Sequence, residues 1–265
     1  MGNRTLVGLV ALLLPAAALA APARKKVDVK AAEAALAGTD LEAAAAAAAD
    51  LGASDAPAAH DALLDALALG VPSAVIAPTL AGLSSHPAPP DVPALVRYAH
   101  HHNPAIRAVA LAALATYPAP DAKAAVVLGL HDKIAIVRGA AAAAAAKGHV
   151  REAVDPLFEL LALGEEPAAR ALAQMADAEL VARIADHLGK VPDPSLALCL
   201  GLVLKRPDFG PDPARVEVVR AIGKIQDQAA LSALTDYIDA TPKSPPRPSR
   251  AEAERMVEAR LGGGK

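Results

Sequence analysis

The chain has 265 residues, of which 70, about 26%, are alanine, and only 2% are aromatic. Alanine and leucine are strong helix formers, whereas β-sandwiches need β-branched and aromatic residues, so the composition predicts an all-α protein and excludes an all-β fold. With 26 Lys and Arg against 29 Asp and Glu, the net charge is −3. The chain therefore lacks the basic excess of a nucleic-acid binder, and no nucleic-acid partner is expected.

The first twenty residues have the organisation of an export signal. Arg4 supplies a positive start, Leu6 to Leu14 is an apolar run, and Ala18-Leu19-Ala20 fits a small-residue cleavage site. We expect residues 1–20 to be a signal peptide cleaved near Ala20, which predicts a periplasmic or extracellular protein. The apolar run is too short for a good membrane span, so stable membrane insertion is not expected.

Helix start and stop signals recur along the rest of the chain. Asn103-Pro104, Asp193-Pro194 and Asp212-Pro213 each place an N-cap residue before a proline that suits the first helical position. No segment shows the alternation of a strand bounded by hairpin turns. The predicted helices span about 30–37, 40–51, 57–69, 72–84, 91–101, 103–116, 120–130, 134–147, 150–162, 167–175, 178–188, 194–204, 213–224, 227–239 and 249–261.

Four of these helices contain a similar short string centred on an arginine. The arginines are Arg107, Arg138, Arg170 and Arg220, and the first three are 31 and 32 residues apart. Three residues after each arginine stands a small residue, which would let two helices approach closely: Ala110, Ala141, Ala173 and Gly223. A short turn and a second apolar helix follow each string, so the sequence predicts repeated helix pairs.

This pattern resembles HEAT repeats, in particular the short bacterial HEAT-like type. The stretch from Asn103 to Leu114 carries the resemblance best, and it extends over about residues 55–240. It implies a right-handed α-solenoid of antiparallel helix pairs. In such solenoids the recurring arginine pairs with an acid or with helix-end carbonyls of a neighbouring repeat, and we expect this role for all four arginines. We expect one helix of a pair to be missing near residues 190–215, which interrupts the register.

Composition divides the chain into five segments. After the signal peptide come a linker at 21–30 and the solenoid at 31–241, whose repeats are clearest over 91–190. A proline-rich linker at 242–248 and a short C-terminal helix and tail at 249–265 follow. Residues 31–90 contain seven acids and no Lys or Arg, whereas 243–265 contain six bases and three acids. The C-terminal helix can fray, pack back on the solenoid, or dock on another protein or on the acidic segment of its own chain. Because the charges are opposite, our hypothesis is docking on the acidic segment of the same chain.

Residues with catalytic or metal-binding chemistry do not form a recognisable motif. His100, His101 and His102 are adjacent, and adjacent helical side chains point about 100° apart, so the three are not expected to converge on one metal. Cys199 lies in an apolar run and is expected to be a buried, unreactive side chain. We therefore expect no catalytic residue, no metal site and no cofactor.

The HEAT-like resemblance also implies an alternative with enzymatic relatives. Some members attach or remove bilin chromophores, and deoxyhypusine hydroxylase binds two irons through repeated His-Glu pairs. This chain has no His-Glu dipeptide; His60-Asp61 and His131-Asp132 come nearest. An enzyme-related HEAT-like protein of the bilin-lyase or hydroxylase type is therefore the alternative interpretation of function.

The leading interpretation is an exported, non-catalytic scaffold that binds a protein or peptide along its inner face. Stacked repeats create extended surfaces, since each unit contacts only its neighbours. In the HEAT-like resemblance the second helices of the pairs line this concave face. The candidate contacts are polar or aromatic residues on those helices: Arg97, Tyr98, His101, Arg183, His187, Asp236 and Tyr237.

Overall fold

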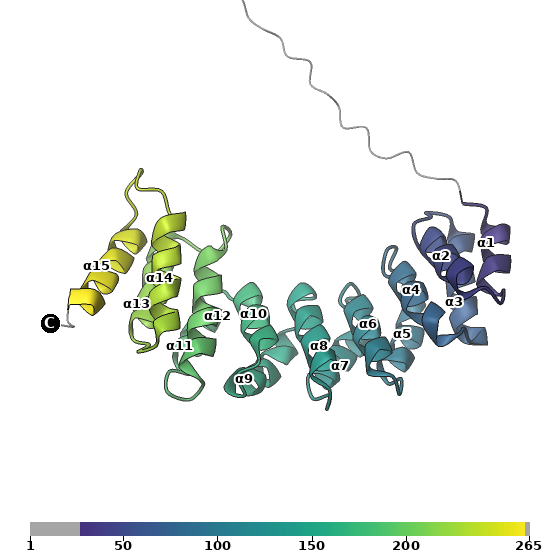
Figure 1. Ribbon diagram of the computed structural model, residues 1–265, viewed down its shortest axis with the longest axis horizontal. Helices are drawn as coiled ribbons and strands as arrows, with labels where there is room; N and C mark the ends of the chain where they lie inside the picture. Colours follow the sequence, from purple (N-terminus) through teal and green to yellow (C-terminus); the bar gives the residue numbers. More distant parts are fainter. Residues whose placement is uncertain (1–26, 263–265) are drawn as a thin grey trace, which may run out of the picture.

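The computed structural model describes residues 27–262 of the chain, and these form a curved stack of fifteen α-helices (Figure 1). The predicted signal peptide and most of the predicted 21–30 linker lie outside the described residues. The helices are α1 (Val29–Leu36), α2 (Leu41–Gly52), α3 (Pro57–Leu69), α4 (Ser73–Leu83), α5 (Asp91–Ala99), α6 (Pro104–Leu114), α7 (Pro120–Gly129), α8 (Ala135–Lys147), α9 (Val154–Ala162, after the 3₁₀ turn η1, Arg151–Ala153), α10 (Glu166–Met175), α11 (Ala178–Ala185), α12 (Asp193–Lys205), α13 (Asp212–Gly223), α14 (Gln228–Ala240) and α15 (Pro248–Gly262).

Local sequence explains where most helices begin. Asn103 caps α6, its Oδ1 accepting a hydrogen bond from the backbone N–H of Ala105 at 2.9 Å, and Pro104 stands at the first helical position. Asp40 caps α2 in the same way. Asp193 and Asp212 were expected to be caps, but they lie inside the first turns of α12 and α13 and make no capping bond. Asp212 instead accepts two hydrogen bonds from α15, described below.

The helices form two layers. Each even-numbered helix from α2 to α14 packs closely on the next even-numbered helix, whereas the odd-numbered helices contact one another more sparsely along most of the stack. In Figure 1, α4, α6, α10 and α12 lie on the upper, inner side of the arc, with α5, α7, α9 and α11 below them. Closer spacing in one layer is what a curved stack requires on its inner side. The fold is thus an α-solenoid of HEAT-like helix pairs, as the sequence predicts.

Small residues permit the close spacing of the inner layer. A Cβ atom added to Gly52 of α2 would lie 2.3 Å from Cα of Gly82 on α4, so the two backbones are in direct contact there. Alanines fill other crossings: Ala110, Ala141 and Ala173 of the arginine strings are all buried. At Gly129 of α7, an added Cβ would lie 3.0 Å from Cβ of Ala141. Alanine-rich helices therefore pack here as a dense core and not as solvated helices.

The predicted gap in the register near 190–215 is wrong. No helix is missing there, because α12 is followed by α13, which lies in the outer layer and packs on α12. The consequence is that α12 is the next inner-layer helix after α10. Arg220 lies on α13, in the outer layer, so the fourth arginine string does not continue the repeat of the first three.

The C-terminal helix α15 packs on α13 and α14, at the opposite end of the arc from α1–α4 (Figure 1). The expected docking of this helix on the acidic 31–90 segment of the same chain is therefore wrong. The reason is geometric, because the stack keeps the two ends apart. Among residues 27–262, no helix has both the length and the apolar character needed to cross a membrane.

Candidate functional site

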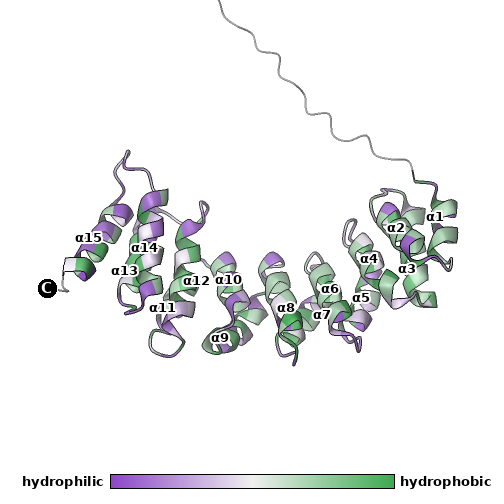
Figure 2. Cartoon of the chain, in the orientation of Figure 1, coloured by the Kyte–Doolittle hydropathy of each residue, from purple (hydrophilic) through white to green (hydrophobic). Residues whose placement is uncertain are grey.

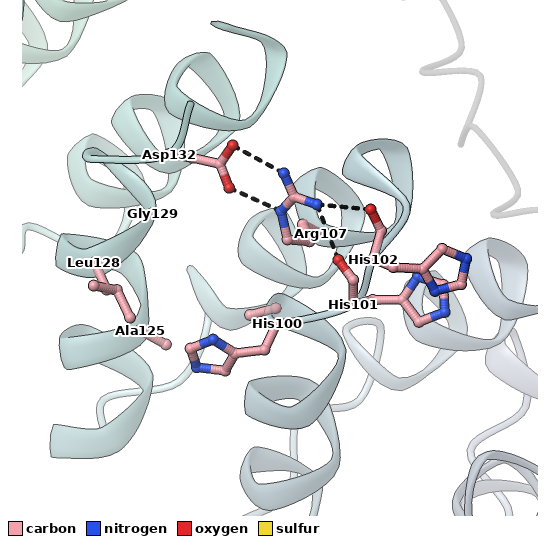
Figure 3. A pocket seen from close by; sticks show the side chains of 9 residues that line it. His100, His101, His102, Arg107, Ala125, Leu128, Gly129 and Asp132 are labelled. Carbon is pink, nitrogen blue, oxygen red and sulfur yellow. Dashed lines mark hydrogen bonds and ion pairs between the residues drawn. The ribbon is translucent and has the colours of Figure 1, made fainter. Parts of the chain in front are cut away.

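Arg107 links three consecutive helices at one edge of the solenoid (Figure 3). Its side chain projects from α6 and donates from Nε to Oδ2 of Asp132 at 2.8 Å and from Nη2 to Oδ1 at 2.9 Å. Its Nη1 donates to the carbonyl oxygens of His101 at 2.9 Å and His102 at 3.1 Å. These carbonyls follow the end of α5, where a helix carries partial negative charge and lacks backbone donors. One guanidinium thus closes the end of α5 and ties α6 to the turn after α7.

Arg138 repeats this arrangement one helix pair later. Its Nη1 donates to the carbonyl oxygens of Asp132 at 2.9 Å and Lys133 at 3.1 Å, after the end of α7. Its Nε donates to Oε1 of Glu165 at 2.8 Å, and Nη2 contacts the same oxygen. Asp132 therefore receives Arg107 on its carboxylate and Arg138 on its backbone carbonyl. The role predicted for Arg107 and Arg138 is what the structure shows.

The other two arginines act differently, and the bridging role predicted for them is corrected in part. Arg170 donates to Glu166 on its own helix, where its side chain is 60% exposed, and makes no recorded bond to another repeat. Arg220 joins α13 to α15 by donating to Glu252 at 3.0 Å, and it also pairs with Glu217. The end of α10 itself is closed by Arg206, whose Nη1 donates to the carbonyl oxygens of Ala173 and Ala176.

The contact between Arg107 and Asp132 changes the pKa of both side chains. The hydrogen bonds from Arg107 lower the pKa of Asp132 below its ordinary value, and the backbone N–H of Ile134 adds to this effect against the opposing effect of burial. The same contact raises the pKa of Arg107. The contact therefore favours the charged form of both side chains.

The three adjacent histidines do not converge. In Figure 3 the ring of His100 points toward Ala125 and Leu128, while the rings of His101 and His102 point the other way. The latter two rings lie with centroids 4.1 Å apart. Residues 27–262 contain no group of three or more His, Cys, Asp or Glu side chains placed to hold a metal ion. The 290 Å³ hollow beside them, which His100 and Leu128 line, is shaped by the Arg107–Asp132 pair.

Three of the predicted partner contacts lie at the end of α5. Arg97 donates from Nη2 to the carbonyl oxygen of Leu67 at 2.8 Å, and the buried Tyr98 hydroxyl donates to the same oxygen at 3.2 Å. His101 stacks near Tyr98 and its Nδ1 accepts the backbone N–H of Asn103. All three side chains are thus used in closing the ends of α3 and α5.

Two further predicted contacts form a cluster between α9 and α11. The imidazole of His187 stacks on Phe158 with centroids 4.1 Å apart and an interplanar angle of 3°. The Cζ atom of Arg183 lies 5.2 Å from the centroid of the Phe158 ring. Nη2 of the same arginine donates to Oδ1 of Asp155 at 2.6 Å. The cluster joins the outer helices of two repeats.

The last two predicted contacts lie on α14. Tyr237 is buried, and its hydroxyl lies 2.7 Å from Oγ of Ser249. Because that serine proton is donated to Asp212, Tyr237 is the donor to Ser249. Asp236 is exposed and accepts a hydrogen bond from Lys205 at 2.9 Å.

The seven predicted contacts do not share one surface. α5 and α11 belong to the outer layer and α14 to the inner layer, and two or more helices separate each from the next. The expectation that the second helix of each pair lines the inner face is wrong for α5 and α11. The arginine-bearing helices α6, α8 and α10 line it instead, because their small residues allow the closer spacing of that side.

The inner face itself went unrecognised in the sequence. The exposed and half-exposed side chains of α4, α6 and α8 lie at helical spacing in one stripe per helix, and Figure 2 shows these helices mostly green. The stripes consist of Ala74, Ala77, Pro78 and Ala81 on α4; of Ala105, Val109 and Ala112 on α6, with Thr116 just beyond its end; and of Ile136, Gly139, Ala140 and Ala143 on α8. Apart from Lys147 at the end of α8, no fully exposed residue of these three helices is charged. The half-exposed Arg107 and Arg138 are paired with Asp132 and Glu165.

A buried polar cluster between repeats also went unrecognised. Asp91, whose side chain is 0% exposed, accepts hydrogen bonds from Nε2 of His60 at 2.7 Å, from the Tyr117 hydroxyl at 2.6 Å and from the backbone N–H of Ala88 at 2.9 Å. Burial and the adjacent carboxylate raise the pKa of Tyr117. The sequence signal was weak, because Asp91 follows two prolines and reads as an exposed first-turn acid.

Cys199 is buried, as predicted, and burial raises the pKa of its thiol to about 12. A thiol with this pKa is protonated and unreactive at neutral pH. It packs within α12 as a small apolar side chain.

These features define the class of the protein as a helical-repeat solenoid held by arginine contacts between repeats. No family profile matches the sequence, and no curated protein matches it. Among solved structures, the chain is similar to the complex of CpcE and CpcF of phycocyanin lyase from Nostoc sp., at 17% identity and a TM-score of 0.49, over 95% of this chain and 99% of that one. It is also similar to karyopherin Kap121p bound to the extreme C-terminus of a protein phosphatase, at 14% identity and a TM-score of 0.48, over 88% of this chain and 30% of that one.

Proposed function

We propose that this chain is an exported, non-catalytic scaffold whose inner face binds a segment of a partner protein. The observation that carries the proposal is the uncharged inner surface of α4, α6 and α8. Three neighbouring helices present small apolar side chains there, and a charged partner surface would lose its water without gaining a counter-charge. An apolar helix or extended segment fits this surface, since alanine stripes leave room for its larger side chains.

The role of the arginines supports the same proposal. The guanidinium groups of Arg107 and Arg138 donate hydrogen bonds to carbonyl groups and carboxylates of neighbouring repeats. These bonds hold successive repeats together and so help to set the curvature of the inner face. A partner would therefore meet a surface that is already formed, which lowers the entropy cost of binding.

The test introduces charged side chains on the inner face and asks whether a bound partner protein is lost. The full exported chain, carrying an affinity tag, is used to capture proteins from the envelope fraction of its host. Ala112→Glu with Ala143→Glu puts two carboxylates on the inner stripes, whereas Ala124→Glu with Ala162→Glu puts two on the exposed outer layer. We expect one partner to be lost with the inner pair only. Equal recovery with both variants would contradict the assignment of the face.

Export is tested separately by N-terminal sequencing of the protein from its host. The proposal expects the chain to begin at Ala21, or at Arg24 if cleavage follows Ala23. A chain that retains Met1 or Gly2 would contradict it. Metal analysis of the same material tests the non-catalytic part, because a stoichiometric metal ion would favour the hydroxylase-type alternative.

A further inference from the structure

A second surface lies on the outer layer at the N-terminal end of the arc. α1, α3 and the turn that follows α3 enclose a hollow of about 460 Å³. Leu36, Ala62, Ala66 and Val71 form its apolar wall, and Leu69 stands at its rim. The Leu69 side chain is 88% exposed, the highest exposure among the large apolar residues of the described chain. Burial of such a side chain by a partner would be favourable, because its apolar surface would leave water.

The charges around this hollow are of one sign. Glu33 of α1 and Asp65 of α3 line it. Asp61 lies one turn before Asp65 on α3 and lines a second hollow of about 270 Å³. Of the nearest Lys and Arg residues in the sequence, Lys30 lies on α1 one turn before Glu33 and does not line the hollow, and the guanidinium of Arg97 is held by the carbonyl oxygen of Leu67. The outer face of α3 therefore combines an apolar hollow with a negative rim.

We propose that this outer face of α1 and α3 is a docking site for a cationic amphipathic segment of a partner protein. An apolar side chain of that segment enters the hollow and covers Leu69, and its Lys or Arg residues face Asp65 and Glu33. Charge complementarity of this kind steers association and fixes orientation, while the apolar anchor supplies affinity. The site is separate from the uncharged inner face and does not depend on it.

The structure argues against a second copy as the occupant. The C-terminal helix would be the basic element of another copy, but its arginines are already engaged. Arg250 and Arg260 donate to backbone carbonyls of α14 and of the turn after α13, and Arg255 pairs with Glu252. A phosphate-bearing surface, whether membrane or nucleic acid, would be repelled by the carboxylates of α1 and α3.

The test uses a fluorescein-labelled synthetic helical peptide that carries leucines on one face and lysines on the other. Binding to the full chain is followed by fluorescence anisotropy at low and high salt. Asp65→Lys with Leu69→Ser should weaken binding by about tenfold or more, since both the charge and the anchor are lost. Binding to the unchanged chain should also weaken at high salt, because screening reduces the attraction.

The matched control lies on another outer helix. Glu159 of α9 and Leu163, which directly follows α9, are also an exposed acid and an exposed leucine four residues apart, and Leu163 is 75% exposed. Glu159→Lys with Leu163→Ser should leave the affinity unchanged. All four positions are exposed, so both proteins should fold. The proposal is overturned if the labelled peptide gives no anisotropy change with the unchanged chain, or if both double variants weaken it equally.

Discussion

Arg107 and Asp132 are joined by two parallel hydrogen bonds, of 2.8 and 2.9 Å, while the remaining Nη1 group of the same guanidinium holds the carbonyl oxygens of His101 and His102. The pair therefore connects the end of α5, the body of α6 and the turn after α7. Such a fork cannot be reproduced by lysine, which offers a point charge without the planar geometry. The contact is the clearest place at which the repeat architecture depends on one side chain.

Replacing Arg107 by Met should destabilise the protein by about 2 kcal/mol, because it leaves a half-buried carboxylate and two helix-end carbonyls without their donor. Arg107→Lys should recover only part of this loss. The matched control is Arg170→Met, since Arg170 is exposed and pairs only within its own helix. That change should cost less than about 0.5 kcal/mol. Urea unfolding followed by circular dichroism measures both, and equal costs would contradict the assigned roles.

The same ion pair predicts a dependence of stability on pH. The pKa of Asp132 is lowered in the folded protein from its ordinary value of 3.8. As the pH falls, this carboxyl group is therefore protonated at a higher pH in the unfolded chain than in the folded one. The stability that the pair contributes is therefore complete above the ordinary value and is lost as the pH falls through the lowered one. The pKa values of Asp177 and Asp208 are lowered as well, so Asp132→Asn should remove only part of the acid sensitivity.

The measurement is the free energy of unfolding at several pH values between about 5 and 2. Arg107→Met should flatten the curve, and Asp132→Asn should flatten it somewhat more, because the backbone N–H of Ile134 still lowers the pKa of Asp132 after Arg107 is removed. The double variant should flatten it no further. A curve for Asp132→Asn that parallels that of the unchanged protein would contradict the assignment.

The contact between Gly52 and Gly82 predicts opposite outcomes for two glycine substitutions. Gly52→Ala would bring the new Cβ to 2.3 Å from the backbone of Gly82, so α2 and α4 must separate. We expect a loss of about 1–3 kcal/mol. A Cβ at Gly139 in α8 meets only the Pro167 ring, at 3.5 Å. Gly139→Ala should be neutral or stabilise the helix by up to about 1 kcal/mol. Thermal unfolding of the two variants measures this difference.

The buried carboxylate of Asp91 predicts a large loss on its removal. Asp91→Ala leaves the backbone N–H of Ala88 without an acceptor and leaves His60 and Tyr117 without their carboxylate. The expected cost is about 3 kcal/mol. Asp121, an exposed acid in the first turn of α7, is the matched control, and Asp121→Ala should cost no more than about 1 kcal/mol. A cost for Asp91→Ala as small as that of the control would show that the cluster does not stabilise the fold.

The helices could be predicted from the sequence because their signals are local. All fifteen predicted helices are present, and most of their ends differ by only a few residues from those observed, since caps, prolines and leucine spacing act within one turn. The ion pairs of Arg107 with Asp132 and of Arg138 with Glu165 could be predicted, because the repeat places an acidic residue in a turn at a similar distance after each arginine. The same prediction failed for Arg170, which pairs with Glu166 one turn earlier on its own helix.

The identity of the inner face could not be predicted from the sequence. Which layer is inner depends on the spacing between helices of successive repeats, and that spacing is fixed by contacts such as the one between Gly52 and Gly82. The burial of Asp91 likewise depends on His60 and Tyr117, which approach it from 31 and 26 residues away. Both are long-range properties to which no local pattern points.

The packing of α15 changes what is expected of the C-terminal segment. Ala253 is fully buried against the preceding helices, and Met256 occupies the space beside Gly223, where an added Cβ would lie 2.2 Å from its Sδ atom. Ser249 donates from its backbone N–H to Asp212 at 2.9 Å and from its hydroxyl at 2.5 Å. These contacts are largely apolar packing and buried hydrogen bonds, and neither is strongly screened by salt.

Deleting residues 242–265 should therefore lower the free energy of unfolding by more than about 2 kcal/mol, because α13 and α14 lose the helix that covers them. The loss should be similar at low and high salt. A docking driven by opposite charge would instead give a loss that shrinks as salt is added. Arg255→Ala is the control, since this exposed arginine pairs within α15, and it should leave the melting temperature nearly unchanged. A loss that disappears at high salt would contradict the packing described for α15 and favour an electrostatic attachment.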